Sequence, residues 1–161
     1  MLIKAPNKTP CDYYKKFKLY MGIHQIEKTD NYKYLGIMID DKLNWKLQIK
    51  TMCSKLSSVC GVISKVRHYL DRKALMLIYN SLFDSRLRYA ILGWGTACEQ
   101  EISKLRVLQN RVVRFINFSP FRTSMSPLYS NLRILPFDDI LLLKKKMYSC
   151  TTCITKTYHL P

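Results

Sequence analysis

The apolar positions of the chain change their spacing near residue 43. From Phe17 to Lys28 apolar residues alternate loosely with polar ones, and a second run extends from Tyr32 to Ile39. Alternation with a period of two predicts β-strands. Thr29-Asp30-Asn31 separates the runs as a turn, so residues 17–39 are predicted to form one antiparallel hairpin. Gly36, inside the second run, predicts a bulge or a close approach by another backbone.

From Leu43 onward the spacing becomes helical. One apolar stripe advances in alternating steps of four and three, which predicts a long helix with one buried face. Asp40 or Asp41 is placed to cap its start, where a carboxylate meets unpaired amides. Residues 42–70 contain several Lys and Arg residues and no acid. The stripe consists of Trp45, Ile49, Met52, Leu56, Val59, Ile63, Val66 and Leu70.

Further helices follow. Asp71 is predicted to cap a helix over residues 72–88, and Gly93-Trp94-Gly95 predicts a break. Later helices are predicted over 99–117, 128–132 and 138–152. The fold class is therefore α+β and predominantly helical, with an N-terminal antiparallel β-hairpin followed by a bundle of about four or five helices. The predicted inner faces carry Leu75, Ile78, Tyr79, Leu82, Phe83, Leu105, Leu108, Val112, Phe115 and Ile116.

The composition and charge of the chain indicate what kind of partner it binds. The chain has 161 residues, 48% of them hydrophobic, which is enough to bury a core in one domain or a piece of one. Its formal net charge of +16 favours a polyanionic partner, with nucleic acid first and an anionic membrane surface second. No apolar stretch is long enough to cross a bilayer and no signal peptide is evident. The six cysteines are interpreted as reduced thiols, which predicts an intracellular protein, nuclear or cytoplasmic and not secreted.

The segment Tyr32 to Trp45, with the sequence YKYLGIMIDDKLNW, resembles a known family. It is similar to the segment that closes the palm of reverse transcriptases encoded by non-LTR retrotransposons of the jockey/LINE-like type. The resemblance continues over most of the chain. Its further positions are Leu75 to Tyr79, Ser81-Leu82, Tyr89, Trp94-Gly95, Leu105, Leu108-Gln109-Asn110-Arg111, Arg114, Ile116, Pro127-Leu128 and Leu132 to Pro136.

The resemblance implies different roles for the two parts of the chain. Residues 1–41 would end the palm and carry the primer-grip hairpin, and residues 42–161 would form a thumb and connection, truncated at the C-terminus. In the complete enzyme these parts hold the primer and the template–primer duplex of an RNA-directed DNA polymerase. Tyr34, Leu35 and Gly36 are the grip candidates, whereas an ordinary buried strand would show the same composition.

Four basic residues are the candidates for contact with the duplex. Lys46, Lys50, Arg111 and Arg114 would neutralise phosphates without reading bases. The alternative is that they form the solvated polar face of ordinary bundle helices. A stand-alone or co-opted nucleic-acid-binding protein, and a helical interaction module that pairs through the stripe of residues 45–70, are the rival functions. The sequence leaves the oligomeric state open.

No catalytic residue is assigned to this chain. Asp40-Asp41 resembles the metal-binding aspartate pair of reverse transcriptases, but that pair lies in a hairpin followed by another strand, whereas here a helix begins. Capping is therefore the interpretation. Mg²⁺ is expected only in the complete enzyme, whose carboxylates would lie upstream, and this chain alone is predicted to be inactive.

Cys150, Cys153 and His159 are the remaining group with possible metal chemistry, because many elements of this family carry a cysteine–histidine knuckle near the C-terminus. Zinc requires four ligands, and a second pair at matching spacing is missing. The two cysteines are equally consistent with packing residues one helical turn apart. No metal site is therefore predicted.

Overall fold

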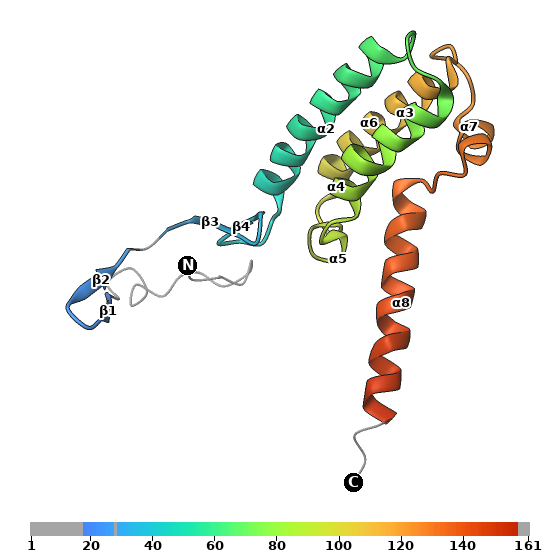
Figure 1. Ribbon diagram of the computed structural model, residues 1–161. Coiled ribbons are helices and arrows are strands. Elements are labelled where there is room, and N and C mark those ends of the chain that lie inside the picture. The colour runs from blue at the N-terminus through green and yellow to red at the C-terminus, as the bar shows by residue number, and fades with distance from the viewer. Residues whose placement is uncertain (1–17, 28, 158–161) are drawn as a thin grey trace. The chain divides into compact units, whose positions relative to one another are not determined.

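The computed structural model describes residues 18–27 and 29–157 (Figure 1). The chain divides after Gln48 into two compact units, each described by itself. The first contains the strands, and the second contains nearly all of the helices. The α+β, predominantly helical class is confirmed.

The N-terminal unit contains two hairpins rather than one. Strand β1 (Leu19–Met21) pairs antiparallel with β2 (His24–Ile26), and β3 (Asn31–Tyr34) pairs antiparallel with β4 (Ile37–Asp40). The prediction of a single hairpin over residues 17–39 is therefore wrong. Each predicted strand is itself folded back, because a glycine with positive φ stands inside each run.

The second reversal is a two-residue turn at Leu35-Gly36. Tyr34 and Ile37 are paired across it, and Leu35 and Gly36 have φ of 47° and 82°. Two consecutive positive φ values define a type I′ turn, whose twist matches that of the flanking strands. Glycine adopts this conformation freely, whereas leucine does so at a cost. Gly36 thus forms a turn, which corrects the predicted bulge.

Asp40 organises the chain between β4 and the first long helix. Its carboxylate accepts hydrogen bonds from the backbone N–H groups of Asn44 at 3.0 Å and Trp45 at 3.2 Å. Leu43 and Trp45 both have positive φ, so this turn is sharp. The predicted capping role holds in a modified form, because Asp40 binds amides just before the helix rather than those of its first turn.

Helix α2 (Lys46–Val66) buries the middle of the predicted stripe, whereas Leu70, its last predicted residue, lies beyond the helix and is 38% exposed. The side chains of Ile49, Leu56 and Ile63 are fully buried, and Met52 and Val59 are nearly so. Cys60, on the same face, donates from its Sγ to the Leu108 carbonyl at 3.8 Å. This contact places the face of α2 against α6 (Glu99–Asn117).

The predicted helix over 72–88 contains a π-helical segment. It consists of α3 (Arg72–Ile78), η1 (Tyr79–Asp84) and α4 (Ser85–Arg88), and Asp71 caps its start by accepting from Ala74 N–H at 3.1 Å. In η1 the Ser85 N–H donates to the Asn80 carbonyl, five residues earlier.

The spacing of the buried residues accounts for the π segment. Leu75, Tyr79, Phe83 and Leu87 are buried at steps of four. An α-helix turns about 100° per residue, so each such step drifts about 40° around the axis. The wider π turn removes this drift and keeps all four on one side. Leu82, predicted on the inner face, is instead 40% exposed.

Trp94 anchors the segment that follows α4 in the core. Helix α5 (Ile91–Trp94) begins after Ala90, whose φ is 51°. The Trp94 ring is fully buried, its Nε1–H donates to the Tyr89 carbonyl at 2.8 Å, and it stacks on Phe137 with 5.9 Å between ring centroids. Gly95 has no space for a side chain, because a Cβ there would lie 2.3 Å from the Ile91 carbonyl oxygen.

The last three long elements are α6, α7 (Met125–Leu132) and α8 (Phe137–Thr157). Helix α6 has the predicted bounds, α7 begins before the predicted residue 128, and α8 extends past the predicted residue 152. Helix α7 packs on α6, and α8 packs on α5 and α6. Phe137 and Ile140 are buried at the start of α8. No helix of the described residues is long and apolar enough to cross a membrane.

Gln109 joins these helices from inside the core. It is 1% exposed, its Nε2 donates to the Tyr79 hydroxyl at 3.2 Å and to the Leu135 carbonyl at 3.0 Å, and its Oε1 accepts from Phe137 N–H at 2.9 Å. One amide thereby connects α6, η1 and the first residue of α8. Buried polar groups satisfied in this way specify how elements dock.

Replacing Gln109 by leucine should therefore destabilise the helical unit. Gln109→Leu keeps the volume but leaves three groups without their partner, and we expect a loss of about 2–4 kcal/mol in the free energy of unfolding. Urea unfolding followed by circular dichroism measures it. Gln100→Leu, an exposed position on the same helix, is the control and should change stability by less than about 0.5 kcal/mol. Equal effects of the two substitutions would contradict the role given to Gln109.

Candidate nucleic-acid interface

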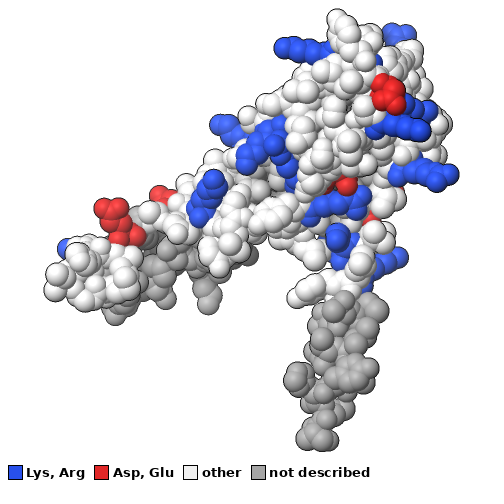
Figure 2. Space-filling model, in the orientation of Figure 1, with Lys and Arg blue, Asp and Glu red and all other residues white. Residues whose placement is uncertain are grey.

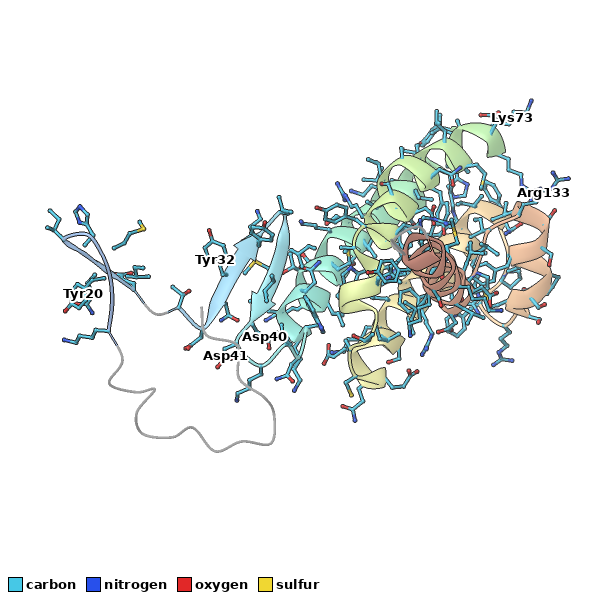
Figure 3. The ribbon with its side chains drawn as sticks, turned by 90° about the horizontal axis from the view of Figure 1, so that it is seen from below. Tyr20, Tyr32, Asp40, Asp41, Lys73 and Arg133 are labelled. Carbon is cyan, nitrogen blue, oxygen red and sulfur yellow. The ribbon has the colours of Figure 1, made fainter. Side chains whose placement is uncertain are left out.

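The predicted grip residues lie at the tip of the β3–β4 hairpin. Tyr34 is 58% exposed and Leu35 is 70% exposed, so the alternative of an ordinary buried strand is wrong. Tyr32, labelled in Figure 3, is also exposed. The hairpin is fixed at its other strand, where Met38 N–H donates to Oε1 of the buried Gln48 at 2.9 Å. An apolar, aromatic tip is thus presented to solvent on a supported hairpin.

Two of the four predicted phosphate contacts lie on α2. Lys46 and Lys50 are both exposed and are separated by one helical turn, so they lie on the same flank of that helix. Within the part of the chain that the structure describes, neither forms an ion pair.

The other two predicted contacts lie on α6 beside aromatic rings. The Cζ atom of Arg111 lies 5.6 Å from the centroid of the Phe115 ring, and that of Arg114 lies 5.0 Å from the Phe121 ring. Arg67, just after the end of α2, has its Cζ 5.3 Å from the Phe115 ring. Each is a cation–π geometry. The structure therefore brings Arg111 and Arg114 together with Arg67.

A groove of about 450 Å³ lies at this place. It is formed by the end of α2, the outer side of α6 and the loop after α6, all within the helical unit. Phe121 is 84% exposed in it. The lining residues are Arg67, Val107, Arg111, Arg114, Phe115, Ser119 and Phe121.

Other cations are neutralised within the fold. Arg88 pairs with Asp84 at 2.5 Å, and Lys104 pairs with Glu101 at 2.7 Å. Arg106 binds both Glu99 and Asp138, and these hydrogen bonds raise the pKa of its guanidinium further above its usual value.

The remaining basic surface is extensive. Figure 2 shows Lys and Arg spread over the visible face of the helical unit, with few acidic residues among them. Lys73 and Arg133, labelled in Figure 3, are exposed examples outside the groove.

Sequence reasoning missed part of the groove. Phe115 is assigned to the inner face but is half-buried at the edge of the helix, where Arg67 and Arg111 cover its ring. Arg67 lies in the acid-free run of residues 42–70, and neither it nor Phe121 is among the predicted contacts. The signal available in the sequence is the repeated combination of arginine and phenylalanine between residues 111 and 122.

The thiol and hydroxyl groups with raised pKa values pack between the helices. Burial raises the pKa of the Cys60 thiol to about 11, so it is protonated at neutral pH. Burial likewise raises the pKa values of the Tyr79 and Tyr129 hydroxyls, and Tyr129 donates to Asn110 Oδ1 at 2.8 Å. These groups hold helices together and are poorly suited to proton transfer.

Among the side chains that the structure describes, no three or more potential metal ligands lie together. The carboxylate of Asp40 is engaged by two backbone amides, as described above. The side chains of Cys150 and Cys153, and all of His159, lie outside the described residues.

Comparisons with known proteins point to one kind of enzyme. The chain is 27% identical, over 130 residues, to the RNA-directed DNA polymerase from mobile element jockey of Drosophila funebris, covering 76% of this chain and 14% of the relative. It is 24% identical over 112 residues to the probable RNA-directed DNA polymerase from transposon X-element of Drosophila melanogaster, covering 67% and 12%. No family model and no solved structure matches.

The alignment covers only a small part of each relative. The chain spans about one eighth of the length of the curated relatives it matches. A polymerase from transposon BS of Drosophila melanogaster matches similarly, at 24% identity over 77% of this chain. The resemblance seen in the sequence is confirmed: the chain is similar to the RNA-directed DNA polymerases of several Drosophila mobile elements, jockey among them.

Proposed function

We propose that this chain is the part of a mobile-element reverse transcriptase that holds the primer and the template–primer duplex. Residues 1–41 close the palm, and residues 42–161 form the thumb and connection. The observation that carries the proposal is the set of cations on α2 and α6 that have no acidic partner among the described residues, in a chain similar to RNA-directed DNA polymerases. Its place of action is the nucleus or the cytoplasm.

The charge distribution supports a duplex-holding role. Arg88, Lys104 and Arg106 pair with acidic side chains within the fold. Lys46, Lys50 and Arg111 are exposed to solvent instead. Phosphate contacts of this kind fix a nucleic acid without reading its sequence. A polymerase that copies any template requires contacts that are indifferent to sequence.

The hairpin tip supports the grip. A type I′ turn between paired strands is a short, rigid element, and rigid positioning of a reacting end accounts for a large part of catalytic rate. Tyr34 and Leu35 are exposed there, and they offer apolar contact to the last nucleotide of a primer.

The two rival functions differ in their support. The interaction module required the apolar stripe of α2 to face a partner, but Ile49, Leu56 and Ile63 are fully buried in the chain's own core. The stand-alone nucleic-acid-binding protein would use the same cations. It differs from the proposal in making no use of a primer end.

Binding of an RNA–DNA hybrid should depend on specific lysines. Lys50→Gln removes one exposed charge, and we expect the slope of log Kd against log salt to fall by about one. Adding Lys46→Gln should lower it by about two in all. Fluorescence anisotropy over 50–200 mM salt measures this. Lys104→Gln is the matched control, because that charge already pairs with Glu101, and its slope should stay unchanged. If Lys46→Gln and Lys50→Gln change the slope no more than Lys104→Gln does, the proposed contacts are refuted.

The hairpin should contact the primer end. A photoreactive benzoylphenylalanine at Leu35 is expected to crosslink to the 3′-terminal nucleotide of a primer annealed to RNA, because this side chain is exposed at the tip. The same group at Tyr20, exposed on the β1–β2 hairpin, is the control. Mapping the crosslinked nucleotide by gel electrophoresis provides the test. Uniform crosslinking along the duplex would favour the stand-alone binding protein.

This chain alone should not extend a primer. Asp40 is committed to backbone amides, and we propose that the carboxylates for the catalytic Mg²⁺ ions come from the rest of the enzyme. A primer-extension assay with Mg²⁺ or Mn²⁺ is expected to show no incorporation above a protein-free blank. Template-dependent incorporation by the purified chain would prove this part of the proposal wrong.

A further inference from the structure

The groove beside α6 has features that a duplex-holding surface does not require. Two guanidinium groups, from Arg67 and Arg111, lie over the Phe115 ring, and Arg67 also lies 5.7 Å from the Phe118 ring centroid. The Arg114 guanidinium lies over Phe121. Three cations and three aromatic rings therefore meet in one place. Lysines alone would suffice to attract a phosphate backbone.

The charges of this cluster are unbalanced. In the described part of the chain no acidic side chain pairs with Arg67, Arg111 or Arg114. The Nε of Arg114 is buried and has no hydrogen-bond partner there. A buried donor without an acceptor costs free energy, and a bound anion relieves that cost. Guanidinium groups bind phosphate oxygens through paired hydrogen bonds.

Phe121 supplies a flat apolar surface beside these charges. Its ring is 84% exposed and the neighbouring Phe118 is 53% exposed, whereas Trp94 and Phe83 in the core are fully buried. An exposed ring next to a phosphate site is suited to stacking with a nucleobase, because every base has a π face. The groove volume of about 450 Å³ is in the range of small-ligand sites, roughly 300–1,000 Å³.

We propose that the groove formed by Arg67, Arg111, Arg114, Phe115 and Phe121 binds one unpaired nucleotide of a single-stranded segment of RNA or DNA. Its phosphate lies between Arg111 and Arg114, and its base stacks on Phe121. In a duplex the base faces are covered by their neighbours, so the ring contributes only when a base is unpaired. The inference rests on the proposed function and assigns part of that surface to the single strand beside the duplex.

The full chain is tested with three labelled ligands: a blunt RNA–DNA hybrid, the same hybrid with a single-stranded RNA extension, and the single-stranded RNA alone. Phe121→Ala is expected to weaken binding of the two ligands with unpaired bases by about 10-fold or more. Blunt-hybrid affinity should change by less than about twofold. Because Phe121 is exposed, the substitution leaves the core intact, which circular dichroism checks.

Three further variants separate stacking from charge. Phe121→Trp should restore binding, whereas Phe121→Leu, which keeps an apolar side chain without an aromatic face, should not. The Phe121 variants should leave the salt slope unchanged, and Arg111→Gln should lower it by about one. This pattern distinguishes a stacking contact from a general loss of positive charge.

The outcomes distinguish this inference from the proposed function. If the wild-type protein binds none of the three ligands, the proposed function is refuted. If the blunt hybrid binds but Phe121→Ala affects no ligand, or affects all three equally, the inference is overturned and the proposed function stands. An acidic peptide that displaces the single strand at a concentration below that of competing unlabelled RNA would also overturn it, since the groove would then favour protein carboxylates.

Discussion

The buried amide of Gln109 is the interaction on which the arrangement of the helical unit depends. Apolar faces can slide or rotate against each other at little cost, because the hydrophobic effect has no direction. Gln109 removes that freedom by engaging the Tyr79 hydroxyl, the Leu135 carbonyl and the Phe137 N–H at once. The π segment serves the same end, since it keeps Tyr79 on the inner face beside Phe83, on which its ring stacks.

This joint also accounts for a motif. Leu108-Gln109-Asn110-Arg111 is among the positions that carry the resemblance to reverse transcriptases, and its members have different roles here. Gln109 and Asn110 bind Tyr79 and Tyr129, which belong to neighbouring elements. Arg111 faces outward over Phe115. A single helical turn thus combines the packing of the core with the proposed contact to nucleic acid.

The charges follow a similar division. Acidic residues are few. Glu99 and Asp138 hold Arg106 between α6 and the start of α8, whereas Asp84 and Glu101 pair with cations one helical turn away. The outer sides of α2 and α6 keep cations without acidic partners in the described residues. Such a surface repels itself in isolation and is stabilised by a polyanion. The proposed function and the inferred nucleotide site both use this imbalance.

The sequence by itself determined the helices, their buried stripes and the basic character of the chain. The stripe of α2 and the bounds of α6 could be predicted because burial of one helical face imposes a period that the residues display directly. The two hairpins could not, since alternation describes a strand but not where it reverses, and a positive φ at Leu35 is not favoured by its residue type.

The tertiary structure alone decided which polar groups meet. Gln109 appears in the sequence as one polar residue among several, and its burial depends on Tyr79, Leu135 and Phe137, which are distant along the chain. The groove likewise needs Arg67 at the end of α2 to lie beside Phe115 on α6. Spacing along a chain reports periods within one element. Contacts between elements depend on how their faces dock, which no local pattern encodes.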